Sequence, residues 1–424
     1  MADNFLEPAD DTAVPLVDPE GQLPGLAAYV KGKFEDAENG RYSYEQRWLQ
    51  AYKNFRGIYD STTTYRDSER SKVFIKITKT KVLAAYGQIV DILFANKKFP
   101  MVVESTPIPE GIAEFAHLET PLDQVIEDPY GFDGDGRDLP FGATEATPSM
   151  DFLGGLEGRY ENAPLRPGPA LMGEPQISPA QRAALNMEKQ IHDQLLDTSA
   201  VNVLRSSIFE SALLGTGIVK GPFNHYKRIH KWEDGPEGRM YTPYEKVVPR
   251  IEHVSPWDFH PDPSATTVDD CEYVIQRHRM NRQQLRGLIA QPHFYKDAIE
   301  ECLAKGPNYE DKYYEDTIRE DETEPYYQGN RYEVLEYWGI LDSKMADEAG
   351  LDVAEQMDEF DQVQVNVWVC GTMVLRCVLN PFTPARIPYQ VFPYEINPYQ
   401  IWGVGVAENM EDAQMLMNGH VRMA

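Results

Sequence analysis

The sequence predicts an α+β fold, in which mixed helices are combined with antiparallel strands and hairpins. The clearest strand is VQVNVWV at 363–369, where every second residue is valine, the period of a strand with one buried face. Gly371 and Thr372 then predict a tight hairpin turn, after which MVLRCVL at 373–379 returns as the second strand. Aromatic residues between positions 44 and 55 recur instead at helical spacings of four, four and three. Helices and hairpins are therefore both expected.

The N-terminal part of the chain is expected to be an acidic arm followed by helices. Residues 1–40 are rich in proline, glycine and acidic residues, which is typical of an arm. Residues 41–104 are expected to be helical. Ser43 and Gln46 form a capping box, which predicts the start of the first helix. Pro100 predicts the end of the second, because proline disfavours the helical conformation of the residue before it.

Proline and glycine recur every few residues over 105–180, which predicts an insertion with little regular structure. The insertion is expected to end at a helix. Ser178 is a suitable N-cap, Pro179 suits the first helical position, and Gln181 lies at the third helical position, where glutamine is favoured.

Residues 181–305 are expected to hold the helices and strands of the core. Strands are predicted at VVPRIEHV (247–254) and CEYVIQRHR (271–279). Asn281 and Gln284 form a second capping box, which predicts that another helix begins directly after the second strand.

The C-terminal third contains an acidic stretch and then a regular one. Residues 309–324 hold eight acidic side chains against two basic ones, so 306–361 is predicted to be an acidic linker or rim. Residues 362–424 are predicted to form the β-hairpin followed by a helix. The helical pattern reaches Ala424 without a stop signal, so the helix is expected to be truncated at the chain end.

Charge and composition exclude several classes of function. The 424 residues include 68 acidic and 40 basic side chains, a net charge of −28, so the surface repels nucleic-acid phosphates and anionic membranes. Sequence-specific DNA binding is therefore excluded, and no apolar run approaches the roughly 20 residues of a membrane span. The four cysteines form no Cys-x-x-Cys pair, which argues against a zinc site or a disulfide framework.

Local motifs give no support for catalysis. The chain contains no phosphate-binding loop, no Gly-x-Ser-x-Gly elbow and no His-Glu-x-x-His string. His253, His260 and Asp262 could form a metal-dependent hydrolase site, but the aspartates and prolines around them suit a turn equally well. We expect no enzyme activity, no catalytic residue, no metal and no cofactor, with the hydrolase as the alternative.

One stretch of the acidic chain is basic. Residues 66–98 carry eight lysines and arginines against three acidic residues. This stretch is either a solvated helix face or an electrostatic docking surface for an acidic neighbour such as a second copy. The candidate residues for subunit-interface electrostatics are Lys72, Lys76, Lys79 and Lys81.

Three segments carry a resemblance to a known family. They are RSKVFIKITKTKVLAAYGQIVDILFANKKFPMVVE (70–104), VSPWDFHPDPSATTVDDCEYVIQRHRMNRQQLRGL (254–288) and NPFTPARIPYQVFPYEINPYQIWGVGVAENMEDAQMLMN (380–418). In their order and spacing they resemble the portal (head–tail connector) proteins of tailed double-stranded DNA bacteriophages, of the podovirus type. In the third segment, Gly403-x-Gly405 leads into a helix. Such portals usually continue beyond this helix, so the C-terminal part of the family fold is expected to be missing.

The resemblance implies a structural virion protein, with 41–104 as part of a wing-like domain. Portal subunits form a ring, usually a dodecamer, at one capsid vertex, and the ring is a conduit for DNA packaging and DNA ejection. The implied partners are other copies of the chain, double-stranded DNA passing without sequence specificity, the terminase, tail or adaptor proteins, and capsid or scaffold proteins. The implied locations are the virion and, during assembly, the host cytoplasm. No channel-lining residue is assigned, and an acidic virion protein without a channel is a further alternative.

Overall fold

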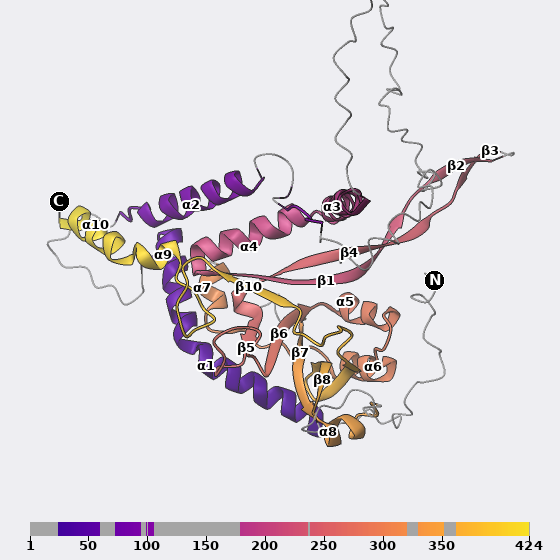
Figure 1. Cartoon of the computed structure of the whole chain (residues 1–424). Coiled ribbons are helices and arrows are strands. Elements are labelled where there is room, and N and C mark those ends of the chain that lie inside the picture. The colour runs from indigo at the N-terminus through magenta and orange to yellow at the C-terminus, as the bar shows by residue number, and fades with distance from the viewer. Residues whose placement is uncertain are drawn as a thin grey trace, which may run out of the picture. The chain divides into compact units, whose positions relative to one another are not determined.

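The computed structural model describes residues 24–59, 73–94, 99, 101–105, 179–235, 238–319, 330–351 and 362–423 (Figure 1). The chain divides into two compact units, one of residues 1–100 with 193–424 and one of residues 101–192. In the smaller unit, the Val103 amide donates to Glu188 of helix α3 (Pro179–Asp197), whose start agrees with the predicted cap and proline. Most of the predicted insertion, residues 106–178, lies outside the described residues. The elements below belong to the larger unit.

The first helix corrects the prediction of an acidic arm over residues 1–40. α1 (Pro24–Arg56) is continuous, and Leu26, Val30 and Phe34 are buried in the hydrophobic core. Their spacing of four places them on one helix face, and this apolar stripe outweighs the acidic composition around it. Ser43 lies in the middle of α1 and therefore does not cap it. Residues 1–23 lie outside the described part of the chain.

Five antiparallel strands form the larger sheet, in the spatial order β5-β6-β7-β8-β9. The predicted hairpin is confirmed as β8 and β9, joined by Gly371, whose φ of 61° is a left-handed value that suits glycine. The strands are β5 (Phe259–Pro261), β6 (Tyr273–Met280), β7 (Tyr332–Asp342), β8 (Gln362–Cys370) and β9 (Met373–Leu379).

The centre of this sheet corrects a second prediction. β7 lies within 306–361, which the sequence assigns to an acidic linker or rim, yet it pairs with β6 on one side and β8 on the other. Its residues are buried on both faces, including Glu336. The flanking helices are α7 (Glu315–Arg319) and α8 (Ser343–Glu348). The acidic residues of β7 are tolerated because a carboxylate that is paired with cations can be buried.

Helices cover both faces of the larger sheet. The valines of β8 at 363, 365, 367 and 369 all pack in one cluster with the N-terminal half of α1, as their alternation predicts. The opposite face packs against the helices that follow β6, and the predicted capping box of Asn281 and Gln284 is confirmed at their start. These helices are α5 (Arg282–Gly287), the 3-10 turn η5 (Leu288–Ala290) and α6 (Lys296–Lys305).

A smaller antiparallel sheet has the order β10-β1-β4 and packs against helix α4 (Figure 1). β1 and β4 continue well beyond β10 as a two-stranded ribbon, at whose end β2 pairs with β3. The elements are α4 (Ala200–Leu214), β1 (Thr216–Ile229), β2 (Trp232–Gly235), β3 (Gly238–Tyr241), β4 (Tyr244–Val254), η4 (Pro256–Asp258) and β10 (Tyr389–Pro393). The predicted strands at 247–254 and 271–279 are thus confirmed, in β4 and β6.

The predicted C-terminal helix is present as two pieces, α9 (Val406–Asn409) and α10 (Glu411–Met423). α10 is tied to α2 (Ile77–Phe94) by Gln414, whose side-chain oxygen accepts hydrogen bonds from the Thr78 amide and hydroxyl at 3.1 and 3.0 Å. Before α9, the backbone of Gly403 approaches Gly215 so closely that a Cβ on Gly215 would lie 2.4 Å from the Gly403 oxygen. A residue with a side chain would not fit at this close approach of the two backbones.

A buried carboxylate joins the two sheets. Glu336 on β7 accepts hydrogen bonds from Lys220 of β1 at 2.5 Å, from His278 of β6 at 2.7 Å and from the Trp338 indole at 2.7 Å. Burial alone would raise the pKa of Glu336, but Lys220 and His278 hold it well below its usual value. A second bond between the sheets runs from the Tyr389 hydroxyl to Gln276 at 2.8 Å. We refer to these residues as the intersheet junction.

Glu336→Gln tests the intersheet junction, because it leaves the Lys220 ammonium buried without its carboxylate. We expect the free energy of unfolding, measured in urea by tryptophan fluorescence, to fall by about 3–5 kcal/mol. The matched control is Glu245→Gln, which breaks an exposed pair with Arg228 and should cost at most about 1 kcal/mol. Equal losses in the two variants would contradict the assignment.

Candidate assembly surface

The three residues of the alternative metal site lie in separate environments. The imidazole of His253 contacts Glu210 at 2.9 Å, and Asp262 accepts hydrogen bonds from the amide and hydroxyl of Ser264 at 2.9 and 2.7 Å. His260 is buried in β5. Among the residues that the structure describes, no group of three or more His, Cys, Asp or Glu side chains could hold a metal ion. The geometry therefore fits the turn interpretation of this segment.

His260 is held neutral by its surroundings. Burial lowers its pKa well below the usual value, and the positive charges of Arg41, Arg277 and Lys312 lower it further. Arg41 is itself fixed, since it donates to the backbone oxygens of Pro256, Trp257 and Phe259 and to the Glu45 carboxylate. His260 is thus part of the packing around α1.

The four cysteines are all buried and unpaired. Burial raises the pKa of Cys271 and of Cys377 to about 12. Both side chains are therefore thiols at neutral pH, whereas a nucleophilic cysteine requires the thiolate.

The predicted interface lysines lie partly within the described residues. Lys76, Lys79 and Lys81 are exposed in and beside the first turns of α2, and the Lys79 ammonium lies 5.8 Å from the centre of the Phe55 ring. Lys72 lies outside the described residues. The lysines are accessible to a partner.

The acidic stretch at 309–324 is partly internal. Within 309–324, Glu315 is 3% exposed and forms an ion pair with Arg277 at 3.2 Å. Its charge is therefore already neutralised inside the subunit. Further along the chain, in and beside α8, Asp342 and Asp347 are exposed.

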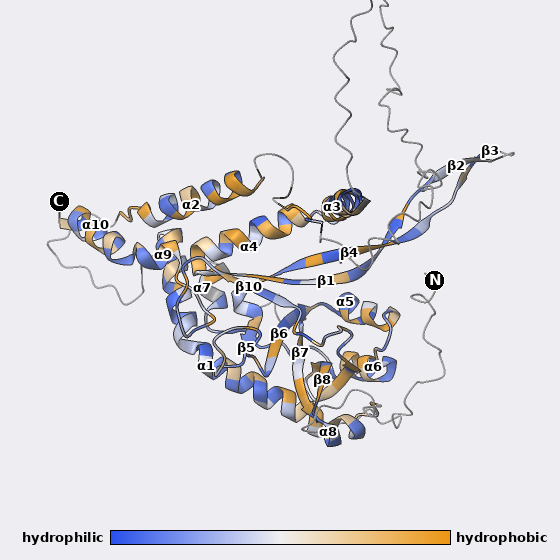
Figure 2. Cartoon of the chain, viewed as in Figure 1, coloured by the Kyte–Doolittle hydropathy of each residue, from blue (hydrophilic) through white to orange (hydrophobic). Residues whose placement is uncertain are grey.

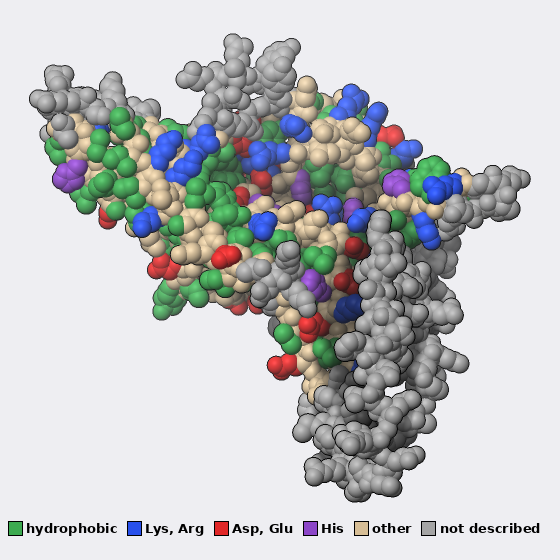
Figure 3. Space-filling model, turned by 90° about the horizontal axis from the view of Figure 1, so that it is seen from above, with side chains coloured by type: hydrophobic (Ala, Val, Ile, Leu, Met, Phe, Trp, Pro, Cys, Tyr) green, Lys and Arg blue, Asp and Glu red, His purple; other side chains and the backbone are tan. Residues whose placement is uncertain are grey.

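The ribbon of β1 and β4 exposes residues on both of its faces. We call residues 224–235 and 238–247 the outer hairpin. Tyr226 and Val247, which are paired across the strands, are 67% and 49% exposed, and the next residues of β1 are exposed as well. Figure 3 shows hydrophobic, basic and histidine side chains close together near its end. The large exposed side chains are Tyr226, Trp232, Met240, Tyr241, Tyr244 and Val247.

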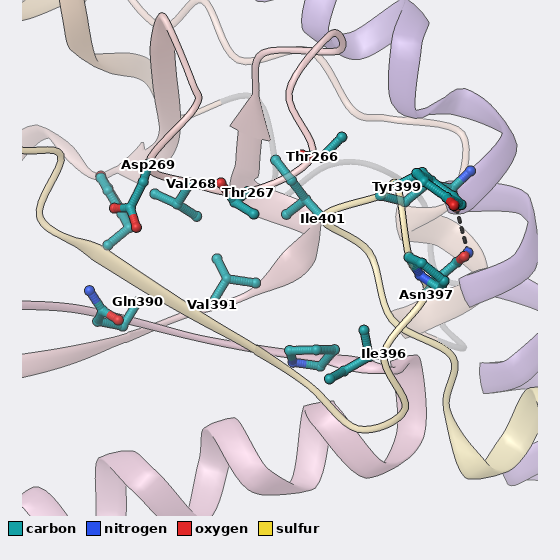
Figure 4. Close-up of a pocket in the computed structure, with 14 residues that line it drawn as sticks. Thr266, Thr267, Val268, Asp269, Gln390, Val391, Ile396, Asn397, Tyr399 and Ile401 are labelled. Atoms are coloured by element: carbon teal, nitrogen blue, oxygen red, sulfur yellow. Dashed lines mark hydrogen bonds between the residues drawn. The ribbon is translucent and has the colours of Figure 1, made fainter.

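A cavity of about 350 Å³ lies beside β10, at the base of the same hairpin (Figure 4). One wall is the loop after β10, in which Ile396 is 76% and Tyr399 is 88% exposed. The Tyr399 backbone has a φ of 78°, a strained value for a residue other than glycine, and the neighbouring Asn397 donates to Gln400 at 2.7 Å. Val268 on a second loop contributes to the opposite wall.

Exposed apolar residues also occur on α2 and α10, which Figure 2 colours partly hydrophobic: Leu83, Ile92, Met415 and Leu416 are 44% to 79% exposed. None of the described helices combines the length and the low charge that a membrane span requires.

A comparison with known protein families shows which family this chain belongs to. The model of the phage SU10 portal protein family matches residues 179–418, more than half of the chain. The chain belongs to the phage SU10 portal protein family. The match covers both sheets, the outer hairpin and the cavity, and it includes two of the three segments on which the resemblance rests, 254–288 and 380–418. No curated protein matches the chain. Its role is therefore that of a structural phage portal protein.

The sequence interpretation missed the outer hairpin and the loop at Tyr399. Residues 223–232, FNHYKRIHKW, place aromatic and basic side chains on both sides of a strand, with no consistently apolar face. That pattern was a usable signal, because a strand buried on one side alternates apolar and polar residues. The loop gives no comparable signal, since Tyr399 becomes an exposed wall only through the packing of β10.

The burial of His260 predicts how stability depends on pH. The folded state keeps His260 neutral while the unfolded chain binds a proton below about pH 6.5, so stability is complete above that pH and is lost below it. This one residue should contribute about 1.4 kcal/mol per pH unit. We expect His260→Gln to flatten the fall of the thermal midpoint between pH 7 and 5.5, measured by differential scanning fluorimetry. The control, exposed His225→Gln, should keep the slope of the unmodified protein; a slope unchanged in His260→Gln would refute the assignment.

Proposed function

We propose that this portal protein forms a closed ring of twelve copies at one capsid vertex. In this proposal DNA is packaged and ejected through the central channel, and the terminase and then the tail attach to the ring. The observation that carries the proposal is the match to the portal family over 179–418, which spans most of the described core.

The charge of the chain suits a conduit. A protein that neutralises DNA phosphates with lysine and arginine binds DNA tightly, because condensed counterions are released. With 68 acidic against 40 basic residues, the ring as a whole would repel the DNA backbone and let it move.

A closed ring also requires two different surfaces on each subunit, one meeting the other on the next copy. The larger unit offers several exposed surfaces of distinct character. The lysines at the start of α2 are basic, the outer hairpin is aromatic and basic, and the cavity beside β10 is apolar. Such a set is what head-to-tail contacts need.

Particle mass tests the ring directly. We expect native mass spectrometry of the purified protein to give a species of twelve times the 48.3 kDa chain, with a central hole in negative-stain images. A single subunit under every salt and concentration condition would contradict the ring and favour an acidic virion protein without a channel.

Reversing the charge of Lys76, Lys79 and Lys81 to glutamate tests their proposed interface role. We expect the fraction of rings to fall, most strongly at low salt, because attraction between exposed charges is screened as salt rises. The matched control reverses Arg286, Lys296 and Lys305, three exposed cations on α5 and α6, and should leave assembly intact. Unchanged ring mass in the first variant counts against this interface.

A further inference from the structure

Within the described part of the chain, few elements support the outer hairpin over its length. The inner half of β1 is paired on both sides, with β10 and with β4, but beyond Lys220 β4 is the only described strand that continues beside it. Two-stranded ribbons without a packed face are marginally stable in water. The described contacts of the outer part to other elements are polar and exposed, such as those of Lys227 and Lys246 with Asp197. A partner that covers this ribbon would therefore stabilise it.

The end of the ribbon carries an aromatic cluster. Trp232 lies directly opposite Tyr241, with ring centres 5.2 Å apart, and His230 stacks on Tyr241 at 5.7 Å. Trp232 is nevertheless 65% exposed. Tryptophan and tyrosine are enriched among the residues that dominate binding energy at interfaces. The cluster is thus suited to enter an apolar site on another molecule.

The charge of the ribbon indicates which partner it fits. The outer hairpin as a whole carries five basic against three acidic side chains. Its first strand, residues 224–232, contains Lys227, Arg228 and Lys231 with two histidines and no carboxylate. A chain with a net charge of −28 is itself an acidic partner, so a second copy attracts this strand.

The cavity beside β10 has the complementary properties. Its walls include the apolar side chains of Val268, Val391 and Ile396, and its volume of about 350 Å³ suits one large aromatic side chain. The residues that line it, within 266–269 and 389–401, include one carboxylate, Asp269, and no lysine or arginine. Asp269 is exposed at the cavity itself (Figure 4).

We infer that the outer hairpin is an assembly arm whose aromatic end docks into the cavity beside β10 of a second copy of this chain. The inference rests on the proposed ring and names one of its contacts. The arm and the cavity are different surfaces, so the contact is head-to-tail and can be repeated from subunit to subunit.

The arm does not reach the cavity of its own subunit. Gln390, which lines the cavity, pairs with Val219 at the base of the hairpin. The ten residues from Lys220 to Ile229 extend the strand by roughly 30 Å away from that base. A contact between Trp232 and Ile396 is therefore a contact between two chains.

Cross-linking tests the inference through the double variant Trp232→Cys with Ile396→Cys. The four native cysteines are buried, so a short bis-maleimide should react first with the two new thiols. We expect a ladder of three or more linked chains on a denaturing gel. Each single variant should give no ladder, and neither should Trp232→Cys combined with Tyr42→Cys on α1, a matched exposed position.

The outcomes separate the arm from the ring. Rings of full mass without a ladder overturn the inference and leave the proposed function standing, whereas a ladder without rings supports the arm and contradicts ring closure. Failure of the unmodified protein to assemble overturns both.

A second variant tests the same contact without chemical cross-linking. Trp232→Ala with Tyr241→Ala should reduce the fraction of rings at least tenfold at a protein concentration where the unmodified chain is half assembled. Tyr42→Ala should not change it. If the double variant forms rings of unchanged stability that bind less DNA than rings of the unmodified chain, the hairpin contacts DNA. That result would also overturn the inference.

Discussion

The burial of the Glu336 carboxylate is the constraint on which the rest of the larger unit depends. A single carboxylate with three donors, one each from β1, β6 and β7, can be accommodated inside a protein only if those strands keep their relative positions. The five-stranded sheet and the smaller sheet are thereby fixed against each other. Because Lys220 pairs with Tyr389, the first residue of β10, and the hairpin continues beyond this pair, the same interaction fixes the direction in which the outer hairpin leaves the subunit.

This arrangement makes the base of the outer hairpin rigid while its outer half lacks a packed face. The inner half of β1 is buried between β10, β4 and α4, while its outer half exposes aromatic and basic residues. Rigidity at the base lowers the entropic cost of docking the end of the arm, since less freedom is lost on binding. The apolar cavity lies at that same base, so a subunit that receives an arm is engaged where its own arm is anchored.

The sequence predicted the elements whose signals are local. The valine alternation of β8, the turn at Gly371 and the cap at Asn281 each depend on neighbours within a few residues, and each is present. The prediction failed where composition competed with spacing or where the partner is distant. Leu26, Val30 and Phe34 form a helix face within an acidic stretch, and β7 contains a glutamate whose cation lies 116 residues away in the chain. The candidate assembly surface was predicted only at the lysines of α2. The exposed ribbon had a local signal at 223–232 that was missed, whereas the cavity arises from the packing of distant loops, which no local pattern encodes.

Hydrogen–deuterium exchange of the hairpin amides, compared between isolated subunits and assembled rings, tests the central claim most directly. The account predicts that amides at 216–220 exchange slowly in both forms, because the intersheet junction and β10 protect them. It predicts that amides in the outer hairpin exchange at least tenfold more slowly in the ring, where a second copy covers them. Equal exchange of the outer hairpin in the two forms would contradict it.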